Sequence, residues 1–264
     1  MLKTLVAVLI VVAACSAPTV DADPTTPEGR SARVAAVLDG DSVRVVVDGA
    51  TTEVRLLGIN APEVDECWAD EARTALQNLL EDEITLVEDG ADQFGRTLAH
   101  LHSGGRHINL ALVEAGAAIA LATEHPDFAA AEQAAFEDRL GLWSPTACGP
   151  AATLEVHISE VSFDAPGPDD ENQNGEFAVV SNEGPEADLG GWWIRDESST
   201  HRFRFPDGFV LGTGDRVIIR SGCGQDGSGE LYWCANGPVW NNDGDMAMLL
   251  DAYGNVDDRW RYEG

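Results

Sequence analysis

The sequence predicts two domains of different fold class: an α+β first half built on a five-stranded barrel of the OB type with added helices, and an all-β second half that forms a β-sandwich. Near the start, β-branched apolar runs alternate with Asp-Gly pairs, a pattern typical of strands joined by hairpin turns. Segments with helical spacing follow in the first half. The second half consists of short strand-like runs between turn residues at regular spacing. A length of 264 residues accommodates one or two domains.

The elements of the first half can be assigned in order. We expect a three-stranded meander over residues 34–38, 43–47 and 52–59. Helices are expected over 68–80, 108–115 and 128–140, and further strands over 84–88 and 97–102. The last helix should end at Gly141, because glycine commonly follows a helix C-terminus. Five such strands with added helices match the OB architecture.

Domain boundaries follow from the changes in composition. We expect a signal segment over residues 1–18, a disordered tether over 19–30, the barrel domain over 31–148 and the sandwich domain over 153–264. A positive start at Lys3 and a short apolar run from Leu5 to Ala14 are typical of an export signal. The chain is therefore expected in the bacterial cell envelope or secreted.

The end of the apolar run favours a lipid anchor. Val12-Ala13-Ala14-Cys15 resembles a bacterial lipobox, in which the cysteine becomes the lipidated first residue. Lipidation at Cys15 would attach the protein to a membrane. An ordinary secretory peptide cleaved nearby, with Cys15 incidental, is the alternative.

Three motifs in the first half carry residue types suited to phosphoester cleavage. Residues 39–42 read Asp-Gly-Asp-Ser, residues 55–63 read Arg-Leu-Leu-Gly-Ile-Asn-Ala-Pro-Glu, and residues 92–96 read Asp-Gln-Phe-Gly-Arg. Carboxylate and carbonyl oxygens bind calcium, and a glutamate can take a proton from water. Guanidinium groups present planar donor forks that suit bidentate contact with phosphate. Each motif alone is weak, whereas the ordered set indicates a phosphodiesterase site.

At these residues the chain, from about Ser31 to Pro145, resembles the staphylococcal nuclease (thermonuclease) family. The resemblance implies an OB-type barrel and calcium-dependent hydrolysis of DNA and RNA. It implies that Asp41, Asn60 and the Ala61 carbonyl hold Ca²⁺. It further implies that Glu63 is the general base and that Arg55 and Arg96 stabilise the five-coordinate phosphorus.

The chain departs from the family pattern at two places. Asn60 stands where the family usually has Asp, so one ligand charge is lost. Ala122 and Glu124 align with two tyrosines that stack on the nucleotide in the best-known member. A catalytically weak or inactive envelope lipoprotein that binds nucleic acid or protein is therefore the alternative function. Retention of Arg55, Glu63 and Arg96 favours the enzyme.

The second half resembles the lamin tail domain, an immunoglobulin-like sandwich. The likeness rests on a Glu-Phe…Asn stretch at 176–182, a Leu-x-Gly-Trp step at 189–192 and an Asn-Asp-Gly-Asp…Leu-x-Asp-x-x-Gly ending. The family has no agreed catalytic residues, so this domain is expected to be an accessory binding domain. A role as an envelope adhesin is a further alternative, although no residue of this domain indicates which ligand it would bind.

Four cysteines remain after Cys15, and export predicts that they form disulfides. Three pairings are conceivable for Cys67, Cys148, Cys223 and Cys234. Pairing within each half, Cys67 with Cys148 and Cys223 with Cys234, is the economical choice. His100 and His102 alternate along the last barrel strand, and without a third ligand they are interpreted as surface residues rather than a zinc site.

The net negative charge of the chain bears on its affinity for nucleic acid. Lys and Arg total 16 against 46 Asp and Glu, giving a net charge of −30. The acidity is spread over both halves, with 7 Arg against 21 acids in residues 31–150 and 7 against 22 in residues 151–264. Nucleic-acid binders normally carry basic patches, so nonspecific affinity for DNA should be weak at low salt. We expect a monomer whose partners are its DNA or RNA substrate and the membrane.

Overall fold

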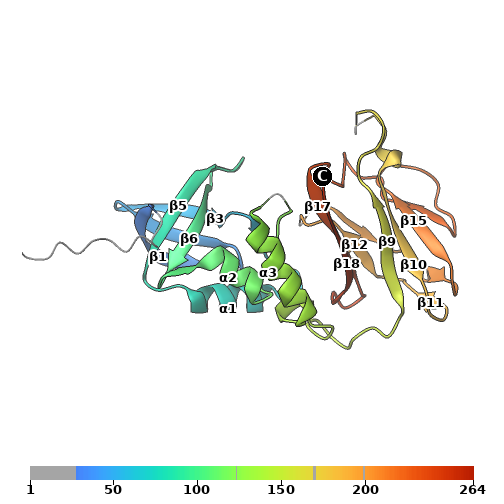
Figure 1. Cartoon of the computed structure of the whole chain (residues 1–264), viewed down its shortest axis with the longest axis horizontal. Helices are drawn as coiled ribbons and strands as arrows, with labels where there is room; N and C mark the ends of the chain where they lie inside the picture. The colour runs from blue at the N-terminus through green and yellow to red at the C-terminus, as the bar shows by residue number, and fades with distance from the viewer. Residues whose placement is uncertain (1–27, 123, 169–170, 199) are drawn as a thin grey trace, which may run out of the picture.

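The computed structural model describes residues 28–122, 124–168, 171–198 and 200–264. The expected signal segment, the lipidation site Cys15 and most of the tether lie outside these residues. Figure 1 shows the barrel and its helices at one end of the molecule and the strand-rich second half at the other. Within the described residues, no helix is long and apolar enough to span a membrane.

The first half is a closed barrel. Its strands are β1 (Arg30–Val37), β2 (Ser42–Val47), β3 (Ala50–Leu56), β5 (Glu83–Ala91) and β6 (Thr97–Ser103), with the short β7 (Arg106–His107) at the edge. The hydrogen-bonded order is β3-β2-β1-β5-β6-β7, and a parallel pairing of β3 with β6 closes the barrel. Val43, Val45 and Val54 are fully buried inside it. The OB-type fold expected from the sequence is thereby confirmed.

The third strand is shorter than expected. The apolar run 52–59 predicts one strand, but β3 ends at Leu56. Gly58 has φ of 72°, a conformation that favours glycine and turns the chain out of the sheet. Ile59 and Asn60 then form β4, which pairs with β8 (Ile119–Ala120). This turn moves Asn60 from the barrel wall to the surface that meets the second domain.

Three helices cover the barrel: α1 (Ala69–Leu79), α2 (Ile108–Glu114) and α3 (Pro126–Glu137), followed by a 3-10 turn η1 (Gly141–Trp143). The third helix begins two residues earlier than expected, because Pro126 occupies the first turn, where proline is favoured. It ends at Glu137, three residues before the expected end, and Gly141 instead opens η1.

The second half contains two four-stranded sheets. One sheet has the order β16-β15-β10-β9, and the other has the order β13-β12-β17-β18. A two-stranded ribbon of β11 (Ala187–Asp188) and β14 (Val210–Leu211) and a 3-10 turn η2 (Gln173–Gly175) complete the domain. The bounds of the first sheet are β9 (Val156–Ser162), β10 (Phe177–Asn182), β15 (Arg216–Arg220) and β16 (Glu230–Tyr232). Those of the second are β12 (Trp193–Arg195), β13 (Arg202–Arg204), β17 (Gly244–Leu250) and β18 (Val256–Glu263). The expected sandwich is confirmed.

The two domains share a packed interface. The sheet that contains β17 and β18 lies beside α3 in Figure 1. A separate apolar cluster joins Ile119 and Trp143 of the first half to Met246 and Met248 of the second. At its edge, the fully buried carboxylate of Glu132 in α3 accepts hydrogen bonds from Arg259 and Arg261 of β18. Removing one partner of such a buried ion pair leaves an uncompensated buried charge, so a change at Glu132, Arg259 or Arg261 should weaken the interface.

Candidate active site at the domain boundary

Asp41, Arg55, Asn60 and Ala61 form one contact cluster at the ends of the barrel strands. Oδ2 of Asp41 accepts a hydrogen bond from the Ala61 backbone N–H at 2.7 Å, across 20 positions of sequence. Nη2 of Arg55 lies 3.0 Å from Oδ2 of Asp41 and 2.9 Å from Oδ1 of Asn60. Asp41 and Asn60 are only 5% and 7% exposed. The residues that the resemblance assigns to the metal therefore lie together around one arginine.

The Asp41 carboxyl is held in a poorly hydrated position. Burial raises its pKa to about 6, although the Arg55 guanidinium and the Ala61 N–H both act to lower that pKa. A buried carboxyl of this kind is stabilised in its charged form by any additional cation close by.

Arg55 is already heavily engaged within the protein. Its Nη1 donates to the carbonyl oxygens of Leu56 and Ile59, each at 3.0 Å. With the hydrogen bond from Nη2 to Asn60, Arg55 donates three hydrogen bonds to protein acceptors, and Nη2 also forms the ion pair with Asp41. Within the described residues, no acceptor engages Nε–H. The expected bidentate phosphate contact from Arg55 therefore requires that a protein acceptor be exchanged for a phosphoryl oxygen.

Arg96 lies at the entry of β6 and is oriented by a local turn. Its Nε donates to Oδ2 of Asp92 at 2.6 Å, while Oδ1 of Asp92 accepts from the backbone N–H groups of Phe94 and Arg96. Within the described residues, no hydrogen bond engages its two terminal nitrogens. The parallel register sets Arg55 opposite Leu98, so Arg96, two residues earlier, falls on the Arg55 face of the sheet.

Glu63 lies in the loop between β4 and α1 and is half-buried. Its backbone N–H donates to Oε2 of Glu66 at 2.7 Å. Its carboxylate makes no hydrogen bond within the described residues, but it acts on Arg195 of the second domain. Burial lowers the pKa of Arg195, and the negative charges of Glu66 and Glu63 oppose that shift. Glu63 and Glu66 of this loop therefore interact electrostatically with Arg195 of the second domain.

Sequence reasoning did not identify Glu66, Arg195, Glu197 and Arg202 as neighbours of this site. Oε1 of Glu66 lies 2.8 Å from Nη1 of Arg195 and 2.7 Å from Nη2 of Arg202. The backbone carbonyl of Glu197 accepts from Nδ2 of Asn60 at 3.0 Å. These contacts join residues about 130 positions apart, and no local pattern in a single sequence signals such pairing.

The donor set fits calcium in kind but is poor in charge. Asp41, the Asn60 amide and the Ala61 carbonyl supply hard oxygens, which Ca²⁺ prefers, with one formal negative charge among them. Both side-chain oxygens also contact Arg55. In the part of the chain that the structure describes, no group of three or more His, Cys, Asp or Glu residues is arranged to hold a metal ion.

The histidines of the last barrel strand differ from their expected surface role. His107 of β7 lies opposite His102, and its ring centroid lies 5.0 Å from that of His100 and 4.7 Å from that of His102. Phe128 packs against His100 and His107. Burial lowers the pKa of His107 to about 4, so its ring is neutral at pH 7. The three rings form a half-buried packing cluster.

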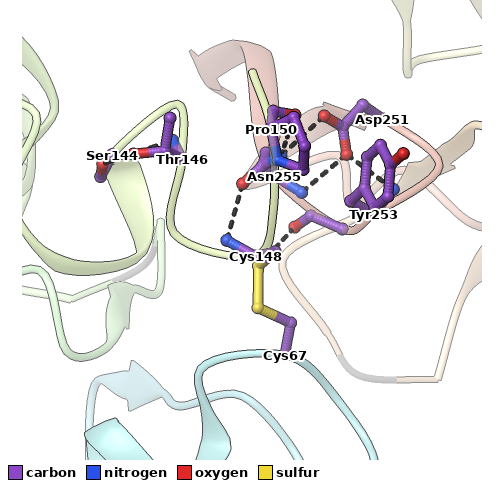
Figure 2. The surroundings of a disulfide bond; sticks show 9 residues. Cys67, Ser144, Thr146, Cys148, Pro150, Asp251, Tyr253 and Asn255 are labelled. Atoms are coloured by element: carbon purple, nitrogen blue, oxygen red, sulfur yellow. Dashed lines mark hydrogen bonds between the residues drawn. A yellow bond between two sulfur atoms is a disulfide. The ribbon is translucent and has the colours of Figure 1, made fainter. Parts of the chain in front are cut away.

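Both expected disulfides are present, Cys67 with Cys148 and Cys223 with Cys234. The first lies next to the candidate site, one residue after Glu66. Figure 2 shows that Cys148 also contacts the second domain: its backbone N–H donates to Oδ1 of Asn255 at 2.7 Å. Asn255 in turn donates to Oδ2 of Asp251. The bond therefore joins the loop after Glu63 to the boundary between the domains.

Comparison with known proteins agrees with these findings. The Staphylococcal nuclease homologue family matches residues 53–145, and the Lamin Tail Domain family matches residues 149–264. Asp41 lies outside the first match, but its contacts with Arg55 and Ala61 attach it to the same site.

Individual relatives match the first half. Protein ParB of Escherichia coli is 34% identical over 146 residues, which cover 50% of this chain and 82% of the relative. A micrococcal nuclease of Shigella flexneri is 34% identical over 125 residues, 42% of this chain and 72% of the relative. An uncharacterized endonuclease of Haemophilus influenzae is 28% identical over 148 residues, 54% of this chain and 78% of the relative. The chain belongs to the staphylococcal nuclease family and carries a lamin tail domain as its second half.

Proposed function

We propose that this chain is an exported, calcium-dependent endonuclease that hydrolyses phosphodiester bonds of DNA or RNA, with the lamin tail domain as an accessory binding domain. The observation that carries the proposal is the cluster of Asp41, Arg55 and Asn60, with Arg96 on the adjoining strand of the same sheet face. Endonucleases among the relatives of the first half support it.

The proposed roles follow from the chemistry of each side chain. Glu63 takes a proton from the attacking water, because its carboxylate makes no hydrogen bond to the described residues. Arg96 offers its terminal nitrogens to the phosphoryl oxygens, and Arg55 offers Nε–H. Phosphoryl transfer depends mainly on positioning and charge stabilisation, so these three residues, together with the bound cation, can supply the chemistry.

Asp41, the Asn60 amide oxygen and the Ala61 carbonyl would hold Ca²⁺. When bound, the ion would supply positive charge beside the scissile phosphate. With one formal charge in the donor set, calcium affinity should lie in the roughly millimolar range of extracellular modules.

The proposal also includes export, and a lipid anchor at Cys15 that would hold the enzyme at the envelope. The signal-like sequence at the start of the chain supports both.

A second candidate is a nucleic-acid or protein binder with weak or no catalysis. The observation that favours it is the engagement of Arg55 in three hydrogen bonds and one ion pair within the protein, which leaves little of its fork for phosphate. Asn60 in place of the family aspartate points the same way.

One experiment separates the two candidates. Purified protein is incubated with single-stranded DNA, with and without calcium, beside the variants Glu63→Gln and Glu71→Gln. Glu71 is an exposed glutamate of α1 and serves as the control. We expect calcium-dependent cleavage, a loss of about 10²- to 10⁴-fold in rate for Glu63→Gln, and an unchanged rate for Glu71→Gln. Retained activity in Glu63→Gln would remove Glu63 as the base, and an inactive parent would favour the binder.

A further inference from the structure

We propose that the lamin tail domain positions the catalytic loop of the nuclease domain. The element responsible is the turn between β12 and β13, with residues 195–198 and 200–202 described, which we name the clamp turn. It contacts Asn60 directly and holds Glu63 through Glu66. This inference rests on the proposed nuclease function and assigns Glu66, Arg195 and Arg202 as positioning residues.

The first clamp contact fixes the orientation of the Asn60 amide. Nδ2 donates to the Glu197 carbonyl, and Oδ1 accepts from Arg55. The reversed amide would set Oδ1 against a carbonyl oxygen and Nδ2 against a guanidinium, so the two neighbours permit one orientation. Oε2 of Glu197 also accepts from the Ala122 N–H at 2.8 Å. A single residue of the second domain thus holds the chain on both sides of the β4–β8 pair.

The second clamp contact acts on the proposed base. One carboxylate oxygen of Glu66 accepts from the Glu63 N–H, and the other accepts a hydrogen bond from Arg195 and forms an ion pair with Arg202. The side chains of Glu66 and Arg195 are 14% and 10% exposed, and that of Arg202 is 30% exposed. Charge-assisted hydrogen bonds in such a poorly hydrated place are strong and directional. A shift of the clamp turn therefore reaches the Glu63 backbone through one side chain.

A third constraint acts at the C-terminal end of the loop, through the disulfide of Cys67. Cys67 follows Glu66 and is bonded to Cys148, whose backbone N–H donates to Asn255 of the second domain (Figure 2). The segment from Asn60 to Cys67 is thus held at Asn60 at one end, and at Glu66 and Cys67 at the other, by groups that belong or attach to the sandwich.

These contacts are separable from those that hold the domains together. The ion pairs of Glu132 with Arg259 and Arg261 join α3 to β18. The buried members of the apolar cluster that includes Met246 and Met248 of β17 all lie outside residues 60–67. Loss of the clamp should therefore alter the loop while the domains remain associated.

The test uses the full chain with Arg202→Gln, Glu66→Gln, the double variant, and Arg202→Lys. Arg204→Gln is the matched control, because Arg204 lies on the same strand and pairs with Asp207 of its own domain. Turnover and KM are measured on single-stranded DNA with calcium. Hydrogen exchange of the peptide that spans residues 59–67 is measured without substrate or metal.

We expect Arg202→Gln and Glu66→Gln to lower kcat by roughly tenfold, with KM within about twofold of the parent. The double variant should be no slower than Glu66→Gln, because both changes remove the same contact. Arg202→Lys keeps a cation near Glu66 and should recover most of the turnover. Exchange at 59–67 should be at least about tenfold faster in Arg202→Gln and unchanged in Arg204→Gln.

The possible results separate this inference from the proposed function. If the parent cuts DNA and both clamp variants keep its kcat, the inference is wrong and the nuclease assignment stands. If the parent cuts nothing, the nuclease assignment fails, and the exchange data still decide on the clamp. Unchanged exchange in Arg202→Gln and Glu66→Gln would show that the clamp does not hold the loop.

Discussion

Asn60 explains how a departure from the family pattern is compatible with a well-packed site. Its amide is bonded at both ends, to Arg55 through Oδ1 and to Glu197 through Nδ2. An aspartate in its place would set a carboxylate oxygen against the Glu197 carbonyl in a buried position. Asparagine thus supplies the N–H donor that the Glu197 carbonyl of the second domain accepts, which aspartate could not do. It also lowers the negative charge available to calcium.

Asn60→Asp should therefore change two properties in opposite directions. Calcium affinity, measured by calorimetry, should increase, because a second carboxylate joins the donor set. The free energy of unfolding without calcium should fall by about 1–3 kcal/mol, since two acceptors face each other where a hydrogen bond was. Asn60→Ser serves as a control that adds no charge. No gain in calcium affinity for Asn60→Asp would remove residue 60 from the metal's ligands.

At the scale of elements, sequence periodicity and turn residues predict those helices and strands whose formation depends on local sequence. The valine-rich strands of the barrel and the helix at α1 follow directly from periodicity and turn residues. Periodicity does not predict the end of β3 at Leu56, because the apolar run continues beyond that residue. The strand ends there because Gly58 has a positive φ and β4 pairs with β8. The clamp turn is equally hidden, since Arg195 and Arg202 acquire a role only when the domains meet.

The motif residues show the same division. The ordered motifs predict the assembly of Asp41, Arg55 and Asn60, because the strands that carry them are neighbours in an OB barrel. They do not predict that two backbone carbonyls accept hydrogen bonds from Nη1 of Arg55, which depends on the local turn of the chain after Leu56.

The two disulfides should differ in their effect on stability. The Cys67–Cys148 pair spans 81 positions and the Cys223–Cys234 pair spans 11. In the chain-entropy model, the longer loop contributes about 4 kcal/mol and the shorter about 3 kcal/mol. Replacing each pair by serines should lower the free energy of unfolding in that order, as measured by denaturant titration. Peptide mapping of protein from an oxidising compartment should recover both pairs, and four free thiols there would refute them.

On the scale of the whole molecule, the buried acid at the domain boundary predicts a pH dependence of stability. Burial raises the pKa of Glu197 to about 8, and the charge of Asp245 adds to this, while the Ala122 N–H and Arg261 oppose it. Between its ordinary pKa near 4.5 and about 8, the folded state binds more protons than the unfolded state, so stability falls as pH rises. Burial lowers the pKa of His107 to about 4, and that opposing effect is confined below about pH 6.5.

With a chelator present, the free energy of unfolding should therefore drop by about 1–2 kcal/mol between pH 6.5 and 8. Glu197→Gln keeps an acceptor for the Ala122 N–H but does not titrate, so it should be more stable than the parent at pH 8. In this variant the free energy of unfolding should fall less steeply with pH, but still fall. The hydrogen bond with Asp196 raises the pKa of His201, and this also makes stability decrease as pH rises. Equal slopes in parent and variant would show that Glu197 is charged throughout this range.

The net charge of −30 leads to a prediction about salt. Most nucleases lose affinity as salt rises, because the release of counterions from nucleic acid drives binding. Here the global field repels DNA, while Arg96 and Arg55 attract phosphate at close range. The Debye length is about 10 Å at 0.1 M salt, so added salt screens the distant repulsion before the contacts within the site. At fixed, saturating calcium, the initial rate should first rise with sodium chloride and then fall. A monotonic decline from the most dilute buffer would mean that the arginine contacts dominate and that the acidic surface has no influence on encounter.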